Sequence, residues 1–200
     1  MEKSDLKIEV KEVLKITNRR FVNLFEMRYL DRKGQEKQWV YASRQDPPKA
    51  ETRDFDSPDA VIIAAYHTEL RKLVIIREFR VPLADYIYGL PAGLIDPGES
   101  IDDCTRRELY EETGLAVTRV RRVSPIIYSS SGMTDESVVM VYLDCAGEPS
   151  NRNAGSTEDI ETVFLSPEEA VQLCGRTDAK FDVKTWLVLN AFAESGRLQE

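Results

Sequence analysis

The sequence has few of the side chains that bind soft metals or form disulfides. Its 200 residues include one histidine, three cysteines and no Cys-x-x-Cys pair. The three cysteines, Cys104, Cys145 and Cys174, are too scattered for a disulfide framework, and a chain of this length does not need one, so we expect reduced thiols. Zinc centres are built mainly from cysteine and histidine, which disfavours zinc here. Any metal would have to be a hard cation held by carboxylates.

Long apolar runs and an excess of positive charge are also missing. The longest uncharged apolar run, residues 60–66, covers about a third of the roughly 20 residues that a membrane helix needs. The first ten residues, MEKSDLKIEV, contain no signal-peptide core, so we expect a cytoplasmic protein without a membrane contact. The formal net charge of −8 argues against a nucleic-acid surface, because such binding depends on neutralising phosphates.

The chain nevertheless has the composition of a globular protein with a substantial core, at 42% hydrophobic and 31% charged residues. Residues 6–43 alternate apolar and polar side chains around two turn-like segments, which predicts antiparallel strands joined by hairpins. Residues 44–59 are polar and contain three prolines, which is typical of a linker. We therefore expect an N-terminal antiparallel β subdomain with its linker over 1–59, and a main domain over 60–200.

The main domain is predicted to be of the α/β class. Strands are indicated by short runs rich in aliphatic or β-branched residues, and two later segments have helical spacing. The expected strands are 60–67, 72–80, 123–130, 137–144 and 161–166, and the expected helices are 166–174, with Ser166 as its N-cap, and 182–195.

The most informative stretch is residues 91–115, PAGLIDPGESIDDCTRRELYEETGL. A glycine-bearing loop leads into a helix that Ser100 caps, with Asp102 and Asp103 in the positive first turn. Gly114 ends the helix because glycine accepts a left-handed conformation.

Three glutamates share one turn of this predicted helix. Glu108 and Glu112 are four residues apart, and Glu111 flanks them. Like charges at this spacing cost about 0.2–0.5 kcal/mol each, and anions near a helix C-terminus oppose its dipole. A cation should compensate them, and carboxylate oxygens suit Mg²⁺, with Mn²⁺ as the alternative.

These residues resemble the Nudix box, G-x₅-E-x₇-R-E-U-x-E-E-x-G-U, in which U is aliphatic. The fixed positions are filled by Gly93, Glu99, Arg107, Glu108, Leu109, Glu111, Glu112, Gly114 and Leu115. The resemblance covers an eighth of the chain and implies a metal-dependent hydrolase of nucleoside diphosphates linked to another moiety. The implied fold is a Nudix-type α/β/α sandwich with a mixed sheet.

The matching positions imply roles for individual residues. Metal ligands would be Glu108, Glu111, Glu112 and the backbone carbonyl of Ala92. Glu99 would support the metal site from the loop, and Arg107 would orient a glutamate through a charge-assisted hydrogen bond.

The flanking sequence 77–99, REFRVPLADYIYGLPAGLIDPGE, resembles the ADP-ribose pyrophosphatase branch of this family. That resemblance implies a homodimer built by the N-terminal sheet, with Trp39 stacking on the base and Arg44 on the phosphate side. Phe79 and Arg80 match the strand-end pair of the branch, and Arg80 would clamp the diphosphate, since its planar fork pairs two oxygens. The implied reaction converts ADP-ribose to AMP and ribose 5-phosphate.

Three features depart from this branch or leave alternatives open. Ser131 stands where a proline is common, and Gly89 stands where ELPAG has glutamate. The loop in which the branch often places its general base offers Glu158 as the best match, while Asp159 and Glu136 stay eligible.

Other interpretations compete with these roles. The substrate could be another nucleoside diphosphate sugar, of the GDP-mannose or UDP-glucose type, and a non-catalytic nucleotide-sugar sensor is the second class of function. Trp39 could instead pack in the subdomain or the dimer interface, and Arg44 and Arg80 could be surface cations. His67, Cys104 and Trp186 are assigned to structure.

Overall fold

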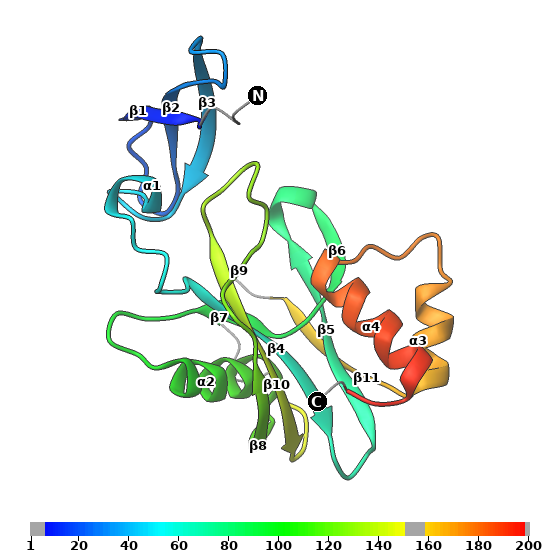
Figure 1. The fold of residues 1–200 in the computed structure, drawn as a ribbon. Coiled ribbons are helices and arrows are strands. Elements are labelled where there is room, and N and C mark those ends of the chain that lie inside the picture. The colour runs from blue at the N-terminus through cyan, green and yellow to red at the C-terminus, as the bar shows by residue number, and fades with distance from the viewer. Residues whose placement is uncertain (1–6, 151–158, 199–200) are drawn as a thin grey trace, which may run out of the picture. The chain divides into compact units, whose positions relative to one another are not determined.

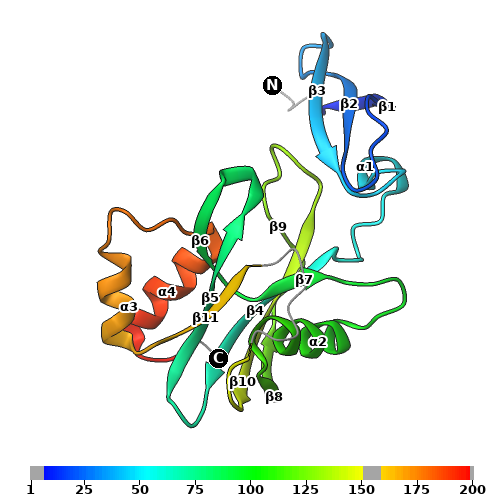
Figure 2. The same ribbon diagram turned by 180° about the vertical axis from the view of Figure 1, so that it is seen from behind.

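The computed structural model describes residues 7–150 and 159–198 and divides into two compact units (Figures 1 and 2). The first unit comprises Met1–Pro58 with Ile126–Val138, and the second comprises Asp59–Pro125 with Val139–Glu200. The elements in chain order are β1 (Glu9–Lys15), β2 (Asn23–Leu30), β3 (Glu36–Ser43), α1 (Lys49–Thr52), β4 (Ala60–His67), β5 (Lys72–Arg80), the 3-10 helix η1 (Val81–Leu83), β6 (Asp85–Gly89), β7 (Ala92–Leu94), α2 (Ile101–Thr113), β8 (Ala116–Val123), β9 (Ile127–Tyr128), β10 (Ser137–Ala146), β11 (Ile160–Leu165), α3 (Pro167–Cys174) and α4 (Val183–Ser195).

The second unit is built on a sheet whose main path runs β11-β5-β4-β10-β8. Strand β5 pairs antiparallel with β11, β4 and β6, and β10 pairs antiparallel with β8. The arrows of β4 and β10 point the same way in Figure 1, so the sheet is mixed. Helix α2 covers one face, and α3 with α4 covers the other (Figures 1 and 2), which gives the expected α/β/α sandwich.

The two central strands, β4 and β5, are buried almost along their whole length. Val61 and Ile63 are fully buried, and so are Leu73, Val74 and Ile75. Because helices cover both faces of the sheet, apolar residues stand at consecutive positions instead of alternating with polar ones. The prediction of strands over 60–67 and 72–80 is confirmed at both ends.

Helix α2 begins and ends as its sequence predicts. The Ser100 hydroxyl accepts a hydrogen bond from the Asp103 N–H at 3.1 Å. Gly114 has a φ of 75°, and its N–H donates to the Tyr110 carbonyl. A β-carbon at Gly114 would lie 2.6 Å from the Ser150 nitrogen, so both conformation and space require glycine there.

The two later helices also match their predicted positions. Ser166 and Glu169 form a reciprocal capping box at the start of α3, and Asp182 caps α4 by accepting from the Lys184 N–H. In the described part of the chain, every helix is too short or too polar to cross a membrane.

Several short strands were not predicted. Strand β7 lies in the stretch expected to be loop, and β6 lies where no element was predicted. Strand β8 precedes the expected strand 123–130, within which β9 forms. Their residues carry weak patterns because these strands are short or lie near the sheet edge, where pairing partners decide the conformation.

The first unit contains the expected antiparallel sheet, in the order β1-β2-β3. Phe25 and Tyr41 stack across β2 and β3 with their ring centroids 5.9 Å apart. Burying an aromatic side chain of this kind contributes roughly 1.5–3 kcal/mol.

The segment predicted to be a linker, residues 44–59, contains a short helix and a buried side chain. They include α1, and Lys49 is fully buried. Its ammonium donates to the Ser57 carbonyl and to the Ser137 hydroxyl, each at 2.6 Å. Asp135 accepts from the Lys49 N–H and from the Ser43 hydroxyl. Asp135 and Ser137 lie almost ninety residues from Lys49 in sequence, so no local pattern indicated these two contacts.

Candidate active site

The carboxylate of Glu108 lies directly against the backbone of Gly93. A β-carbon built at Gly93 would lie 1.8 Å from the carboxyl carbon of Glu108, a distance that no side chain tolerates. Strand β7 holds Gly93 in place, because Val61 of β4 is its partner in the sheet. Helix α2 packs on β7 and β4, so the glycine lets a helix carboxylate touch the strand backbone.

Glu112 points to the same short strand from the next turn of α2. Its carboxylate accepts a hydrogen bond of 3.1 Å from the Ala92 N–H, and the residue is only 7% exposed. A nearly buried carboxylate near a helix C-terminus is costly unless it is compensated, and the Ala92 N–H is one donor that compensates it.

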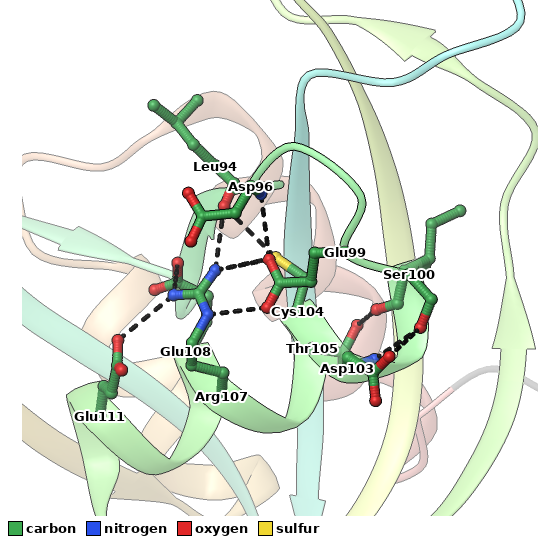
Figure 3. A network of polar contacts seen from close by, with 11 residues as sticks. Leu94, Asp96, Glu99, Ser100, Asp103, Cys104, Thr105, Arg107, Glu108 and Glu111 are labelled. Atoms are coloured by element: carbon green, nitrogen blue, oxygen red, sulfur yellow. Dashed lines mark hydrogen bonds and ion pairs between the residues drawn. The ribbon is translucent and has the colours of Figure 1, made fainter.

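Arg107 binds two glutamates of the cluster and a third carboxylate from the preceding loop (Figure 3). Its guanidinium donates two hydrogen bonds of 2.8 Å to the carboxylate of Glu99. A further bond of 2.6 Å goes to Glu108, and one of 3.3 Å goes to Glu111. The fifth oxygen partner is the Leu94 carbonyl at 3.1 Å. Arg107 therefore joins the loop, β7 and α2 in one network.

These contacts shift the protonation equilibria of the network. The Arg107 guanidinium, with help from the Asp96 N–H, lowers the pKa of Glu99 from 4.5 to about 2. Hydrogen bonding to Glu99 in turn raises the pKa of Arg107 above its ordinary value. Burial raises the pKa of the neighbouring Cys104 thiol to about 12, so this thiol stays protonated and structural.

The carboxylates of Glu108, Glu111 and Glu112 are the side chains predicted to bind a hard cation. The described residues contain no group of three or more His, Cys, Asp or Glu side chains arranged to hold a metal ion. Arg107 donates to Glu108 and Glu111, and the Ala92 N–H donates to Glu112. Glu111 is the most exposed of the three glutamates, with 44% of its side chain accessible. Carboxylate oxygens are the ligands that Mg²⁺ and Mn²⁺ prefer, so the donor types fit these cations, and the metal-ligand roles stay predictions.

The end of β5 carries the predicted substrate residues Phe79 and Arg80. Phe79 packs edge to face on Tyr86, with ring centroids 5.4 Å apart. The Arg80 side chain is 56% exposed, and its guanidinium nitrogens lie 3.3 Å from the Glu78 carboxylate. Arg80 therefore has both a fixed partner and access to solvent.

The candidates for the general base differ in their surroundings. Glu158 lies outside the described residues. The Asp159 carboxylate accepts a hydrogen bond from the Tyr86 hydroxyl, which raises the pKa of Tyr86. Glu136, in the first unit, accepts from Arg44 at 2.9 Å and from Ser129 at 3.0 Å. Both described carboxylates are thus hydrogen-bonded, and the assignment of the base stays a prediction.

The predicted base-binding residues lie in the first unit. Trp39 is 52% exposed, and its indole N–H donates to the Gly132 carbonyl at 3.1 Å. Arg44 pairs with Glu136, so two residues predicted to act on the substrate bind one another. The Ala42 N–H also donates to the Met133 carbonyl, which attaches the segment 126–138 to β3.

Comparison with known proteins identifies the family. Residues 56–187, about two thirds of the chain, match the model of the NUDIX domain. The chain belongs to the NUDIX domain family. The predicted Nudix box, residues 93–115, lies within the matched region.

Individual Nudix relatives agree with this assignment. An uncharacterized Nudix hydrolase of Schizosaccharomyces pombe is 31% identical over 159 residues, covering 74% of this chain and 72% of the relative. An ADP-ribose pyrophosphatase of Bacillus subtilis is 31% identical over 130 residues, covering 64% of this chain and 68% of the relative. A Caenorhabditis elegans protein named nudix hydrolase 2 is 37% identical over 116 residues, or 54% of this chain. The chain spans about half the length of that last relative, at 52%.

A solved structure shares the fold. The crystal structure of an ADP compounds hydrolase superposes with a TM-score of 0.73 and 20% identity, covering 96% of this chain and 97% of the other. The predicted Nudix-type sandwich with an N-terminal antiparallel sheet is confirmed.

Two polar residues that contact predicted site residues, Tyr86 and Glu78, did not follow from the sequence. The Tyr86 hydroxyl donates to Asp159, and the guanidinium carbon of Arg77 lies 4.2 Å from the centroid of the Tyr86 ring. The other is Glu78, next to Arg80 and Gly89. Period-two alternation along β5 could have indicated that Glu78 and Arg80 share a face, but Tyr86 and Gly89 required the register between β5 and β6.

Proposed function

We propose that this Nudix protein hydrolyses the diphosphate bond of a nucleoside diphosphate linked to another moiety, with ADP-ribose as the leading substrate. The products would be AMP and ribose 5-phosphate. Relatives that bear the name ADP-ribose pyrophosphatase support this substrate class. The observation that carries the proposal is the contact between the Glu108 carboxylate and Gly93, with Glu112 beside Ala92.

The proposed cofactor is Mg²⁺, with Mn²⁺ as an alternative. It would be held by Glu108, Glu111, Glu112 and the Ala92 carbonyl. When bound, such a cation neutralises phosphate oxygens and acidifies a water molecule. The need for it follows from charge, since a polyanionic diphosphate resists attack and this chain has a formal net charge of −8.

The residues of the chain then have distinct tasks. Arg107 holds Glu108 and Glu111 in position through charge-assisted hydrogen bonds, and Glu99 in turn fixes the guanidinium of Arg107. Arg80 pairs with diphosphate oxygens through the N–H groups that face solvent. A carboxylate, with Glu158 as the first choice over Asp159 and Glu136, accepts the proton of the attacking water.

The first unit is proposed to bind the base and to form a homodimer. The exposed indole of Trp39 offers a face for base stacking. Arg44 would bind phosphate in place of its present ion-pair partner, Glu136. Light scattering tests the dimer, and a monomeric, fully active protein would contradict a shared site.

A second candidate is the hydrolysis of another nucleoside diphosphate sugar, of the GDP-mannose or UDP-glucose type. The departures at Ser131 and Gly89 from the ADP-ribose branch favour keeping it. A sensor that binds nucleotide sugars without turnover is disfavoured, because every carboxylate of the box is present.

One experiment separates these functions. A panel of ADP-ribose, other nucleotide sugars and dinucleotides is incubated with the protein and Mg²⁺, and the products are identified by chromatography and mass. Preferred formation of AMP from ADP-ribose supports the proposal. Preferred turnover of a GDP or UDP sugar supports the rival, and binding without turnover of any substrate supports the sensor.

A further inference from the structure

Strand β5 carries a carboxylate, Glu78, that the proposed chemistry does not yet use. We propose that Glu78 is a positioning residue that holds the guanidinium of Arg80 ready for the diphosphate, and that Gly89 provides the space for it. This inference rests on the proposed function, because it assigns Arg80 to the diphosphate.

The pairing of Glu78 with Arg80 is a two-point contact. Arg80 Nη1 donates to Glu78 Oε2 at 3.3 Å, and Arg80 Nε lies 3.3 Å from Glu78 Oε1. The two residues are two apart on one strand, so both side chains leave the same face. Glu78 is only 15% exposed whereas Arg80 is 56% exposed. The carboxylate is therefore the fixed partner, and the outer N–H groups of the guanidinium face solvent.

Gly89 makes room for this carboxylate on the neighbouring strand. In the β5–β6 register Gly89 pairs with Ile76 and Ile87 pairs with Glu78, so Gly89 is a diagonal neighbour of Glu78 on the same face. A β-carbon at Gly89 would lie 3.3 Å from Glu78 Oε1 and 3.5 Å from the Ile76 side chain. The first distance is tighter than an ordinary contact, so a β-carbon at position 89 would require the Glu78 carboxylate to shift by a few tenths of an ångström.

The chain leads from Gly89, beside this pair, to Ala92, whose N–H donates to Glu112. Gly89 is three residues before Ala92, so their α-carbons are at most about 11 Å apart. The proposal requires Arg80, at the end of β5, to contact a diphosphate bound beside β7. A freely rotating arginine loses side-chain conformational entropy when it binds a ligand. Because Glu78 already restricts Arg80 in the free protein, less entropy is lost on binding.

The test is a double-mutant cycle on kcat and KM for the preferred diphosphate substrate, with Glu78→Ala, Arg80→Ala and the combination. Glu78→Ala should raise KM roughly three- to tenfold with kcat nearly unchanged, because orientation of Arg80 aids ground-state and transition-state binding alike. In the Arg80→Ala background the same change should have little further effect. Glu78→Gln keeps an acceptor oxygen and should recover part of the affinity.

Two further variants control the interpretation. Gly89→Ala should also raise KM, but by less than Glu78→Ala. If Glu78→Ala does not fold, Gly89→Ala takes its place in the cycle. Glu161→Ala removes a carboxylate that pairs with Arg77 on the adjacent strands at 3.7 Å, and should leave both constants unchanged.

Additive effects in the cycle, an unchanged KM, or a loss confined to kcat would overturn the role of Glu78 while leaving the hydrolase function intact. If wild-type protein turns over no member of the substrate panel, the proposed function fails. In that case the affinity of each variant for ADP-ribose is measured by calorimetry. Additive changes in affinity, or no binding at all, also overturn the inference.

Discussion

Arg107 and Glu99 are joined by two hydrogen bonds of 2.8 Å that connect helix α2 to the loop before it. A bidentate pair of this kind fixes orientation as well as distance. Since the same guanidinium contacts Glu108 and Glu111, the loop position determines where two proposed metal ligands lie.

The first prediction concerns Arg107 itself. Arg107→Ala should lower the free energy of unfolding by about 1–3 kcal/mol, because three carboxylates lose a charged donor. Turnover should fall more than stability explains, since Glu108 and Glu111 lose their positioning. Chemical denaturation and steady-state kinetics measure the two effects. Arg107→Lys is the matched control and should recover charge but not the bidentate geometry. Unchanged kinetics in the alanine variant would argue against a positioning role.

The second prediction is a pH dependence of stability that Glu99 causes. Its pKa in the folded protein is about 2, below the ordinary 4.5. The contribution of Glu99 is therefore present above about pH 4.5 and is lost as the pH falls towards 2. The free energy of unfolding, measured by chemical denaturation, should be higher for the wild type than for Glu99→Gln at about pH 5. The two values should converge at about pH 2. A constant difference across that range would show that the ion pair is not its source.

The third prediction concerns Gly93. Gly93→Ala should reduce turnover roughly 10- to 100-fold, because the new β-carbon displaces the Glu108 carboxylate that now lies 1.8 Å from its position. The matched control is Gly175→Ala at the end of α3, where the nearest contact would be an ordinary 3.5 Å. Kinetics and melting temperatures of both variants check this. Equal activity of the two variants would mean that the close approach at Gly93 has no catalytic importance.

The fourth prediction concerns the proposed metal site. Glu112→Gln should lower Mg²⁺-dependent turnover by on the order of 100-fold or more, since an amide is a poorer ligand than a carboxylate. The protein should stay folded, because glutamine retains an oxygen that accepts from the Ala92 N–H. Activity as a function of Mg²⁺ concentration, with circular dichroism for the fold, provides the measurement. Full activity in this variant would refute the ligand role.

The fifth prediction concerns the thiols. Burial raises the pKa values of Cys104 and Cys145 to about 12, whereas Cys174 is only partly buried. A disulfide reagent at about pH 8 should therefore modify Cys174 first in the native protein. Cys174→Ser should remove this fast phase, and a fast phase that survives the substitution would contradict the assignment.

Much of the fold was predictable because its signals are local. Ser100, Ser166 and Asp182 begin their helices by binding backbone N–H groups two or three residues ahead, and Gly114 ends α2 through its own conformation. Apolar runs likewise located β4 and β5. Strand β7 was missed because three residues carry too little pattern, and their conformation depends on pairing with β4.

The candidate site was predictable in its residue types but not in its contacts. The spacing of Glu108, Glu111 and Glu112 predicts a nearby cation, and in the structure Arg107 binds two of these glutamates, Glu108 and Glu111. The sequence could not indicate that Arg44 and Glu136 bind one another, because they are 92 residues apart.

By itself, the sequence determined the helix limits, the central strands and the membership in the Nudix family, since each depends on neighbours within one or two turns or on a fixed motif spacing. Only the tertiary structure decided which charges meet. Glu78 contacts Arg80 beside Gly89 through the β5–β6 register, and Lys49 is buried against Ser137. Such pairs follow from the packing of strands and loops that are distant in the chain, and packing is a property of the whole fold.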